Sequence, residues 1–584
     1  MTAHVIDPTV LRITELDGEP ARELVGGKAW SLWRMSNLGL RVPPAFVITT
    51  KSCSDYFSGG RCLTDDLFDE IVDGIKYLED RTGRTFGRGE HPLLVSVRSG
   101  AAVSMPGMMD TILNLGINPD TETALAAETD HPDFAADVHR RFCALYGKLV
   151  AGCLDDLEDL PDTATVLAAI EDETGAQVPA DPMVALREAV TAVFDSSQSK
   201  RAKAYRAHYG IPDDLGTAVT VQAMVFGNLD DDSGTGVLFT RNPLTGDREP
   251  YGEYLPRGQG EDVVSGRVTP RPLSWLAEQR PELHTELITA ATLLDTEGRD
   301  AQDIEFTVQH GVLYLLQSRP AKRTAQAAIR IATTLVGDGT IDPATACSRV
   351  SAEQVRHLLR PSIDPDAIGD TTPLATGVSA SPGYAVGRVV LTADEAQQHP
   401  GSILVRESTS PEDVHGMIAA AAVVTENGGS TSHAAVVSRA LDTPCVVGCG
   451  AGTAKSLAGK IVTVDATGAR VFDREIPGQA ATIDDDPDLA ALLGWARDLA
   501  PIVAVHPDES GSASIGAADF DADAAIGAVG DVPTIPPGTR TVVGAYFDTD
   551  AGVAAALDAG VTTILTRNPL PVLLAALAHR KATR

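Results

Sequence analysis

A single histidine in a glycine-rich turn is the residue of this chain best placed for nucleophilic chemistry. His433 follows an apolar run at 419–424 and the pair Gly428-Gly429. The run is short enough for a buried strand, the glycines permit a tight turn, and Thr431 or Ser432 can cap a following helix. The pattern predicts that the imidazole lies at a helix N-terminus.

That position suits a phosphoryl group. The N-terminus of a helix carries partial positive charge and unpaired N–H groups, so it disfavours protonation of His433 and stabilises a phosphoryl group on the ring. A neutral imidazole at pH 7 is a nucleophile. A histidine in such a turn can equally serve only to cap or pack the helix start, so these residues alone leave both a phosphorylated catalytic role and a structural role open for His433.

Basic side chains also lie beside glycine-rich phrases early in the chain. Lys28 follows Gly26-Gly27, and Arg98 ends an apolar run that leads into small residues. Such loops let backbone N–H groups approach phosphate oxygens, and arginine supplies a planar charged fork. The phrase is not the Walker pattern, which excludes a P-loop kinase as the source of ATP binding.

A pair of carboxylates is predicted on one strand face further along. The runs 303–308 and 312–320 flank a turn at 309–311, which indicates a hairpin. Because side chains alternate along a strand, Asp303 and Glu305 share one face. Two carboxylates on one face suit Mg²⁺, which prefers oxygen ligands and bridges nucleotide phosphates.

Two sets of sequence motifs in this chain resemble those of known enzymes. The segment from Gly428 to Arg439, with Pro444 to Gly448, resembles the phosphohistidine domain of the phosphoenolpyruvate-utilising enzymes. The phrases around Lys28 and Arg98, the run 104–110 and the hairpin resemble the nucleotide domain of pyruvate phosphate dikinase. Resemblance covers roughly residues 20 to 478.

The resemblance implies a set of ligands for ATP and Mg²⁺. The strand around Gln222 to Met224 would face the adenine, and Asp303 with Glu305 would hold the metal. The remaining side chains would lie near the phosphates, namely Lys28, Arg98, Arg141, Arg241, Glu253, Glu261, Gln317 and Arg319.

The elements that must position these residues can be predicted from the local patterns. A helix is expected from about Lys28 to Leu38, ending at Gly39, followed by a strand at 45–49. The β-rich runs 217–228 and 233–243 are joined by a polar turn, which predicts a hairpin.

Length and motif order predict a mixed α/β and α+β multidomain protein. We expect an ATP-grasp-like nucleotide-binding region at 1–322, a helical linker at 323–373 and a swivelling phosphohistidine domain at 374–478. Residues 479–584 would be a truncated α/β tail with a flexible segment at 507–540. About 100 residues after the phosphohistidine domain are too few for the (β/α)8 barrel that carries the pyruvate site in the dikinase.

The amino-acid composition argues against several classes of binding partner. The formal charge of −33 argues against nucleic acid and anionic membranes. Seven scattered cysteines suggest neither a disulfide framework nor a zinc site. The absence of a long apolar run or a leader pattern predicts a cytoplasmic protein.

The expected activity is the first half-reaction of an ATP-dependent phosphotransferase of the dikinase type. ATP and inorganic phosphate would give AMP, pyrophosphate and phosphohistidine at His433, and a separate pyruvate or phosphoenolpyruvate barrel protein would complete the reaction in trans. One alternative is a small-molecule phosphotransferase of the drug-modifying kind. Another is a non-catalytic regulatory protein that uses the phosphohistidine domain for binding.

Overall fold

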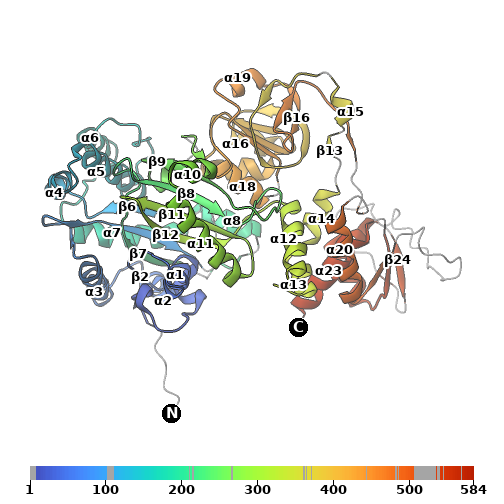
Figure 1. The fold of residues 1–584 in the computed structure, drawn as a ribbon, viewed down its shortest axis with the longest axis horizontal. Coiled ribbons are helices and arrows are strands. Elements are labelled where there is room, and N and C mark those ends of the chain that lie inside the picture. Colours follow the sequence, from blue (N-terminus) through green and yellow to red (C-terminus); the bar gives the residue numbers. More distant parts are fainter. Residues whose placement is uncertain are drawn as a thin grey trace, which may run out of the picture.

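The computed structural model describes residues 8–101, 111–209, 211–213, 216–264, 268–359, 362–363, 365–369, 371–441, 443–479, 483, 486–505, 535, 539–543, 545–566 and 568–583. They form three units (Figure 1). We call residues 8–320 the N-terminal unit, 375–479 the middle unit, and 325–358 with 487–583 the composite unit. The predicted phosphate-loop run 104–110 and most of the 507–540 segment lie outside the described residues.

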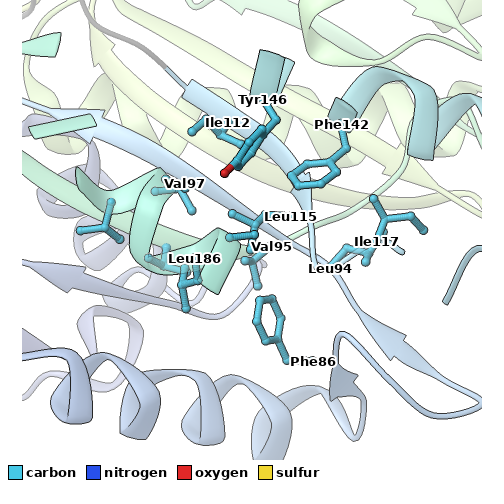
Figure 2. Close-up of a cluster of buried hydrophobic side chains, with 14 of the residues drawn as sticks. Phe86, Leu94, Val95, Val97, Ile112, Leu115, Ile117, Phe142, Tyr146 and Leu186 are labelled. Atoms are coloured by element: carbon cyan, nitrogen blue, oxygen red, sulfur yellow. The ribbon is translucent and has the colours of Figure 1, made fainter. Parts of the chain in front are cut away.

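The N-terminal unit begins with a five-stranded sheet in the order β1-β2-β7-β5-β6. Its strands are β1 (Val10–Leu11), β2 (Ala45–Ile48), β7 (Ala218–Ala223), β5 (Val95–Gly100) and β6 (Thr111–Leu115). The helices around it are α2 (Thr50–Ser58), α3 (Asp65–Thr82), α4 (Pro119–Thr129), α5 (Pro132–Tyr146), α6 (Thr163–Thr174), α7 (Pro182–Ser196) and α8 (Lys200–Tyr209). Apolar residues of β5, β6, α5 and α7 meet in one core, shown in Figure 2.

A second five-stranded sheet of the same unit has the order β10-β9-β8-β11-β12. Its strands are β10 (Arg271–Pro272), β9 (Tyr251–Pro256), β8 (Gly234–Phe239), β11 (Gln302–Gln309) and β12 (Val312–Pro320), accompanied by α9 (Gly260–Val264), α10 (Leu273–Gln279) and α11 (Pro281–Gly298). The predicted β11–β12 hairpin is confirmed. Ile304, Phe306 and Val308 enter a core with α11. The alternate positions 303 and 305 therefore lie on the other face.

The hairpin predicted between residues 217–228 and 233–243 is wrong. β7 pairs with β2 and β5 in the first sheet, whereas β8 pairs with β9 and β11 in the second. The polar turn thus carries the chain from one sheet to the other. Strand propensity identifies both strands, but it does not specify their partners.

The first long helix starts earlier than predicted. α1 spans Arg22–Asn37 and contains a kink at Gly26, whose φ is 75°. A Cβ at Gly26 would lie 1.9 Å from the carbonyl oxygen of Gly100, so only glycine permits this approach to β5. The kink places Lys28 next to the end of β5, where the Gly27 amide donates to Ala101 O at 3.0 Å.

The middle unit is built on an eight-stranded sheet in the order β14-β21-β20-β16-β17-β18-β19-β15. The strands are β14 (Ala375–Thr376), β15 (Val378–Ser381), β16 (Tyr384–Val390), β17 (Ile403–Arg406), β18 (Ala422–Thr425), β19 (Cys445–Val447), β20 (Ile461–Asp465) and β21 (Arg470–Phe472). The helices are α16 (Ala393–Gln398), η3 (Pro411–Asp413), α17 (Val414–Ala419), α18 (His433–Leu441) and α19 (Thr453–Leu457).

The strand before the predicted catalytic turn is shorter than expected. Ala419 ends α17, and β18 begins only at Ala422, so the apolar pattern of 419–421 belongs to a helix end and its connection. The predicted helix start is confirmed, because α18 begins at His433. Ser432 acts as its cap, with Oγ 3.5 Å from the Ala435 amide.

The segments expected as linker and tail share one hydrophobic core. The helices are α12 (Ala325–Gly337), α13 (Pro343–Arg349), α14 (Ala352–Leu358), α20 (Pro487–Leu499), α22 (Asp550–Asp558) and α23 (Pro569–Ala582). They pack with a parallel sheet of β23 (Val503–Val505), β25 (Thr563–Leu565) and β24 (Thr541–Val543). Thr333 on α12 donates to Asp488 on α20 at 2.7 Å. The predicted mixed α/β multidomain class is confirmed.

None of the helices in the described part of the chain is both long and apolar enough to cross a membrane.

Candidate functional site

His433 is partly buried, and its imidazole contacts one hydroxyl. Its Nδ1 lies 3.3 Å from Oγ1 of Thr409, on the loop after β17. Nε2 is buried and has no hydrogen-bond partner among the residues described. Burial lowers the pKa of His433 to about 4, although the nearby Asp413 and Glu412 carboxylates oppose this shift. The ring is therefore neutral near pH 7 and can act as a nucleophile.

The loop before His433 is bound to the N-terminal unit by one carboxylate. Glu253 on β9 accepts from the Ser430 amide at 3.2 Å, the Ser430 hydroxyl at 2.7 Å and the Thr431 hydroxyl at 2.5 Å. A Cβ at Gly429 would lie 2.8 Å from Oε1 of Glu253, so the loop approaches closely only with glycine there. Sequence resemblance had suggested that Glu253 lies near phosphates, and the structure places it against this loop.

Other contacts between the two units surround this loop. Arg201 on α8 lies 3.6 Å from Glu412. Tyr205 on α8 joins the hydrophobic core of the middle unit. The guanidinium of Arg439, on α18, lies 5.7 Å from the ring centroid of Phe239. The middle unit is thus docked on the N-terminal unit with α18 toward it (Figure 1).

The docking residues and the predicted metal carboxylates occupy one face of the second sheet. Cross-strand register places Tyr251, Phe239, Asp303 and Arg319 in one row. It places Glu253, Val237, Glu305 and Gln317 in the next row. With one strand between β9 and β11, the His433 loop is anchored about 10 Å along the sheet from the carboxylates.

Asp303 and Glu305 form ion pairs with two of the predicted phosphate ligands. Arg319 Nε lies 2.8 Å from Asp303, and Arg98 lies 3.2 Å from Glu305. Burial raises the pKa of Asp303, because Arg319 only partly offsets the desolvation of the carboxylate. Burial also disfavours the charge on Glu305, but Arg98, Arg319 and Lys28 together outweigh it and lower its pKa.

Lys28 belongs to the same cluster. Burial and the positive charge of Arg98 lower the pKa of Lys28 to about 7, against the attraction of Glu305. Gln222 on β7 lies beside the cluster, since its Oε1 is 3.4 Å from Arg98 and its Nε2 donates to Pro43 O at 3.1 Å. The structure thus brings together residues that lie almost 300 positions apart in the sequence.

The other predicted ligands lie further out or have structural partners. Arg141 on α5 pairs with Asp137 at 2.7 Å and with Asp262 at 2.8 Å. Arg241 pairs with Asp295 of α11 at 3.1 Å. Met224 packs against the core of the first sheet. Glu261 lies on α9, and its side chain is outside the described part of the structure.

Two buried oxygens on this face could accept a cation. Asp303 Oδ1 and Gln317 Oε1 have no hydrogen-bond partner among the described residues. Within that same part of the chain, no group of three or more His, Cys, Asp or Glu residues could hold a metal by itself. A divalent cation here would need oxygens from a nucleotide as well, which fits the way Mg²⁺ binds phosphates.

Comparisons with known proteins agree with this architecture. Residues 22–69 and 60–288 match the family model described as pyruvate phosphate dikinase, AMP/ATP-binding domain, and residues 398–468 match that of the PEP-utilising enzyme, mobile domain. The chain is 41% identical over 515 residues to pyruvate, phosphate dikinase of Clostridium symbiosum.

The chain belongs to the pyruvate phosphate dikinase family.

A second relative, the chloroplastic pyruvate, phosphate dikinase 1 of Zea mays, is 44% identical over 471 residues. The alignments cover 81% and 76% of this chain, but only 59% of the Clostridium protein and 49% of the Zea mays protein. The chain therefore spans about half to three-fifths of the length of these dikinase-family relatives. The matched regions include the second sheet's docking strands and the His433 turn.

Sequence reasoning missed several residues that link the two units of this dikinase-family chain. Arg439 ends a segment that resembles the phosphohistidine domain, but the sequence assigns it no role. Neither Thr409 nor Tyr251 is singled out by the sequence; Tyr251 hydrogen-bonds Ser430, and its pKa is raised mainly by burial. Their roles depend on which face of the sheet contacts the His433 loop, and this contact joins segments that are distant in the sequence. The one local signal is the spacing of Tyr251 and Glu253, which places both side chains on the same face of a strand.

Proposed function

We propose that this chain catalyses the nucleotide half-reaction of a dikinase, in which ATP phosphorylates His433. The observation that carries the proposal is the shared sheet face: the His433 loop is bound at Glu253 in the row that also contains Glu305 and Gln317. This contact anchors the loop that carries the neutral His433 about 10 Å along the sheet from a cluster of cations and carboxylates, which supports transfer from a metal–polyphosphate bound there.

The cationic side chains would bind and neutralise the phosphates. Lys28, Arg98 and Arg319 surround the two carboxylates. Further out, we assign Arg141, Arg241 and Glu261 to the phosphate side and Gln222 with Met224 to the adenine side, as the family resemblance implies. Asp303, Glu305 and Gln317 would hold Mg²⁺, which when bound would offset the negative charge of the phosphates.

His433 would act through Nε2. A proton on Nδ1 donated to Thr409 leaves the lone pair on Nε2. Nε2 attacks the β-phosphorus, the bond from that phosphorus to the α,β-bridging oxygen breaks, and AMP leaves with the electron pair. Inorganic phosphate then takes the terminal phosphoryl group as pyrophosphate, leaving one phosphoryl group on His433.

The second transfer requires an acceptor. The relatives are named pyruvate, phosphate dikinases, and we propose pyruvate as the acceptor, bound by a barrel unit that a separate protein can supply. We also propose a cytoplasmic location. All seven cysteines are unpaired, which is typical of a reducing compartment.

The test compares the wild-type protein with His433→Ala in the presence of ATP, Mg²⁺ and phosphate. We expect AMP formation and acid-labile label from β-labelled ATP on the wild type only, with ATP binding retained by the variant. Label on both proteins, or on neither while ATP still binds, would contradict the proposal. Adding pyruvate and a barrel protein should then discharge the label; discharge by an alcohol instead would indicate a small-molecule phosphotransferase.

A further inference from the structure

Arg439 is a buried cation that belongs to the middle unit but faces the N-terminal unit. It lies near the end of α18, and its side chain is 3% exposed. Its Nη1 donates to Ala380 O at 2.9 Å and to Ser430 O at 2.8 Å. One corner of the guanidinium is therefore fixed to the loop that carries His433.

The other two nitrogens of the guanidinium make no hydrogen bond with the described residues. Nε and Nη2 are buried and lack hydrogen-bond partners among the described residues. Burial lowers the pKa of Arg439, opposed by the nearby Asp303 carboxylate, yet an arginine remains protonated in a protein. A buried guanidinium whose Nε and Nη2 N–H groups make no hydrogen bond loses the hydration of those groups without replacement.

The position of Arg439 is fixed by its contact with Phe239. The guanidinium carbon lies 5.7 Å from the ring centroid. Phe239 is the register partner of Asp303 on one side and of Tyr251 on the other. Arg439 therefore lies over β8. This strand separates β9, which binds the His433 loop through Glu253, from β11, which carries the carboxylates.

Asp303 and Arg439 carry opposite charges, but their unpaired polar atoms do not bond to each other. Asp303 Oδ1 is buried and, within the described chain, has no hydrogen-bond partner, and the same holds for Arg439 Nε and Nη2. The carboxylate oxygen needs a cation or a donor, whereas the guanidinium needs an acceptor. A metal-bound phosphate meets both needs at once, with the cation toward Asp303 and a phosphate oxygen toward Arg439.

We propose that Arg439 is a polyphosphate ligand that the middle unit contributes to the nucleotide site. This inference rests on the proposed function. Its free N–H groups donate to oxygens of the β- or γ-phosphate of ATP, while Nη1 holds Ser430. The same side chain thereby positions the phosphates relative to the His433 loop. AMP, which lacks both terminal phosphates, makes no use of it.

The test measures binding of ATP and of AMP, each with Mg²⁺, by calorimetry on the full chain. A His433→Ala background prevents consumption of ATP. We expect Arg439→Gln to weaken ATP binding tenfold or more and to change AMP binding less than twofold, because only ATP has the terminal phosphates that would accept charge-assisted hydrogen bonds from Arg439. Arg439→Lys keeps the charge without the fork and should retain part of the preference for ATP.

The matched control is Arg388→Gln, which removes the same charge from an exposed position on β16 of the same unit. It should bind both nucleotides like the parent. Equal weakening of ATP and AMP by Arg439→Gln, or unchanged affinity for both, overturns the inference while leaving the proposed function intact. If Arg439→Gln does not fold, full ATP preference in Arg439→Lys overturns it. Failure of the parent to bind ATP would instead contradict the proposed function itself.

Discussion

Glu253 of the N-terminal unit holds Ser430 of the middle unit, with 2.7 Å between Oε1 and the serine hydroxyl oxygen. The same carboxylate also binds the Ser430 amide and the Thr431 hydroxyl. Ser430 is three residues before His433. One side chain of the sheet thus holds the loop that carries the nucleophile while the two units are docked.

Replacing Glu253 by Gln should slow phosphorylation of His433 and leave the affinity for ATP nearly unchanged. The amide keeps the shape of the carboxylate but loses its charge, which weakens three hydrogen bonds by about 1–2 kcal/mol in total. We expect a rate about five- to thirtyfold lower in single-turnover labelling. Glu249→Gln, at a nearby exposed position, is the control. An unchanged rate for Glu253→Gln would show that this contact does not support transfer.

A methyl group at Gly429 should interfere with the same contact. In Gly429→Ala the new Cβ would lie 2.8 Å and 3.0 Å from the two carboxylate oxygens of Glu253. We predict a reduced labelling rate that is partly restored when Glu253 is also changed to Ala, because the clash is then removed. Gly494→Ala, where nothing lies within 4 Å, serves as control. Additive effects of the two substitutions would contradict the predicted contact.

Asp303→Asn should strongly reduce phosphoryl transfer, whereas the protein should still fold. Burial already raises the pKa of Asp303, so a neutral side chain is tolerated there, although the ion pair with Arg319 is lost. Loss of the oxygen charge should reduce the labelling rate at least a hundredfold and raise the Mg²⁺ concentration needed for half-maximal rate. Glu278→Gln, at an exposed position on α10, is the control. A rate within threefold of wild type would exclude Asp303 as a metal ligand.

ATP binding should take up a proton at pH 8 through Lys28. In the free protein the pKa of Lys28 is lowered to about 7, so at pH 8 the amine is about nine-tenths neutral. Phosphates favour the ammonium form and raise this pKa, hence binding draws a proton and ATP affinity increases as pH falls from 9 toward 7.

Calorimetry in buffers of different ionisation enthalpy measures that uptake directly. We expect close to one proton per ATP at pH 8 and a much smaller uptake at pH 6, where Lys28 is already charged. Lys28→Met should lose the uptake at pH 8. Uptake that persists in this variant would assign the proton to another group.

The sequence predicted the local parts of the site better than their assembly. The position of His433 at the start of α18 followed from a strand, a glycine turn and a capping serine, all within a short segment. The pairing of Asp303 with Glu305 on one face followed from strand alternation and a hairpin turn. These features depend on neighbours in the sequence, where steric rules and periodicity apply directly.

The rest depends on contacts between distant segments. β7 and β8 were recognised as strands, but their membership of different sheets is decided by long-range packing. The resemblance predicts Glu253 near the phosphates. In the docked structure its carboxylate accepts hydrogen bonds from the middle unit. The shared core of α12 with α20 and α23 joins segments that local patterns cannot connect.

The most direct test of the central claim follows the two phosphates of ATP separately. Wild-type protein is incubated with Mg²⁺ and either β-labelled or γ-labelled ATP, before and after inorganic phosphate is added. If His433 attacks the β-phosphorus, both labels are found on the protein without phosphate. Added phosphate then removes the γ label as pyrophosphate and leaves the β label, and His433→Ala carries neither. Label from the γ-phosphate alone, with ADP as product, would contradict the account.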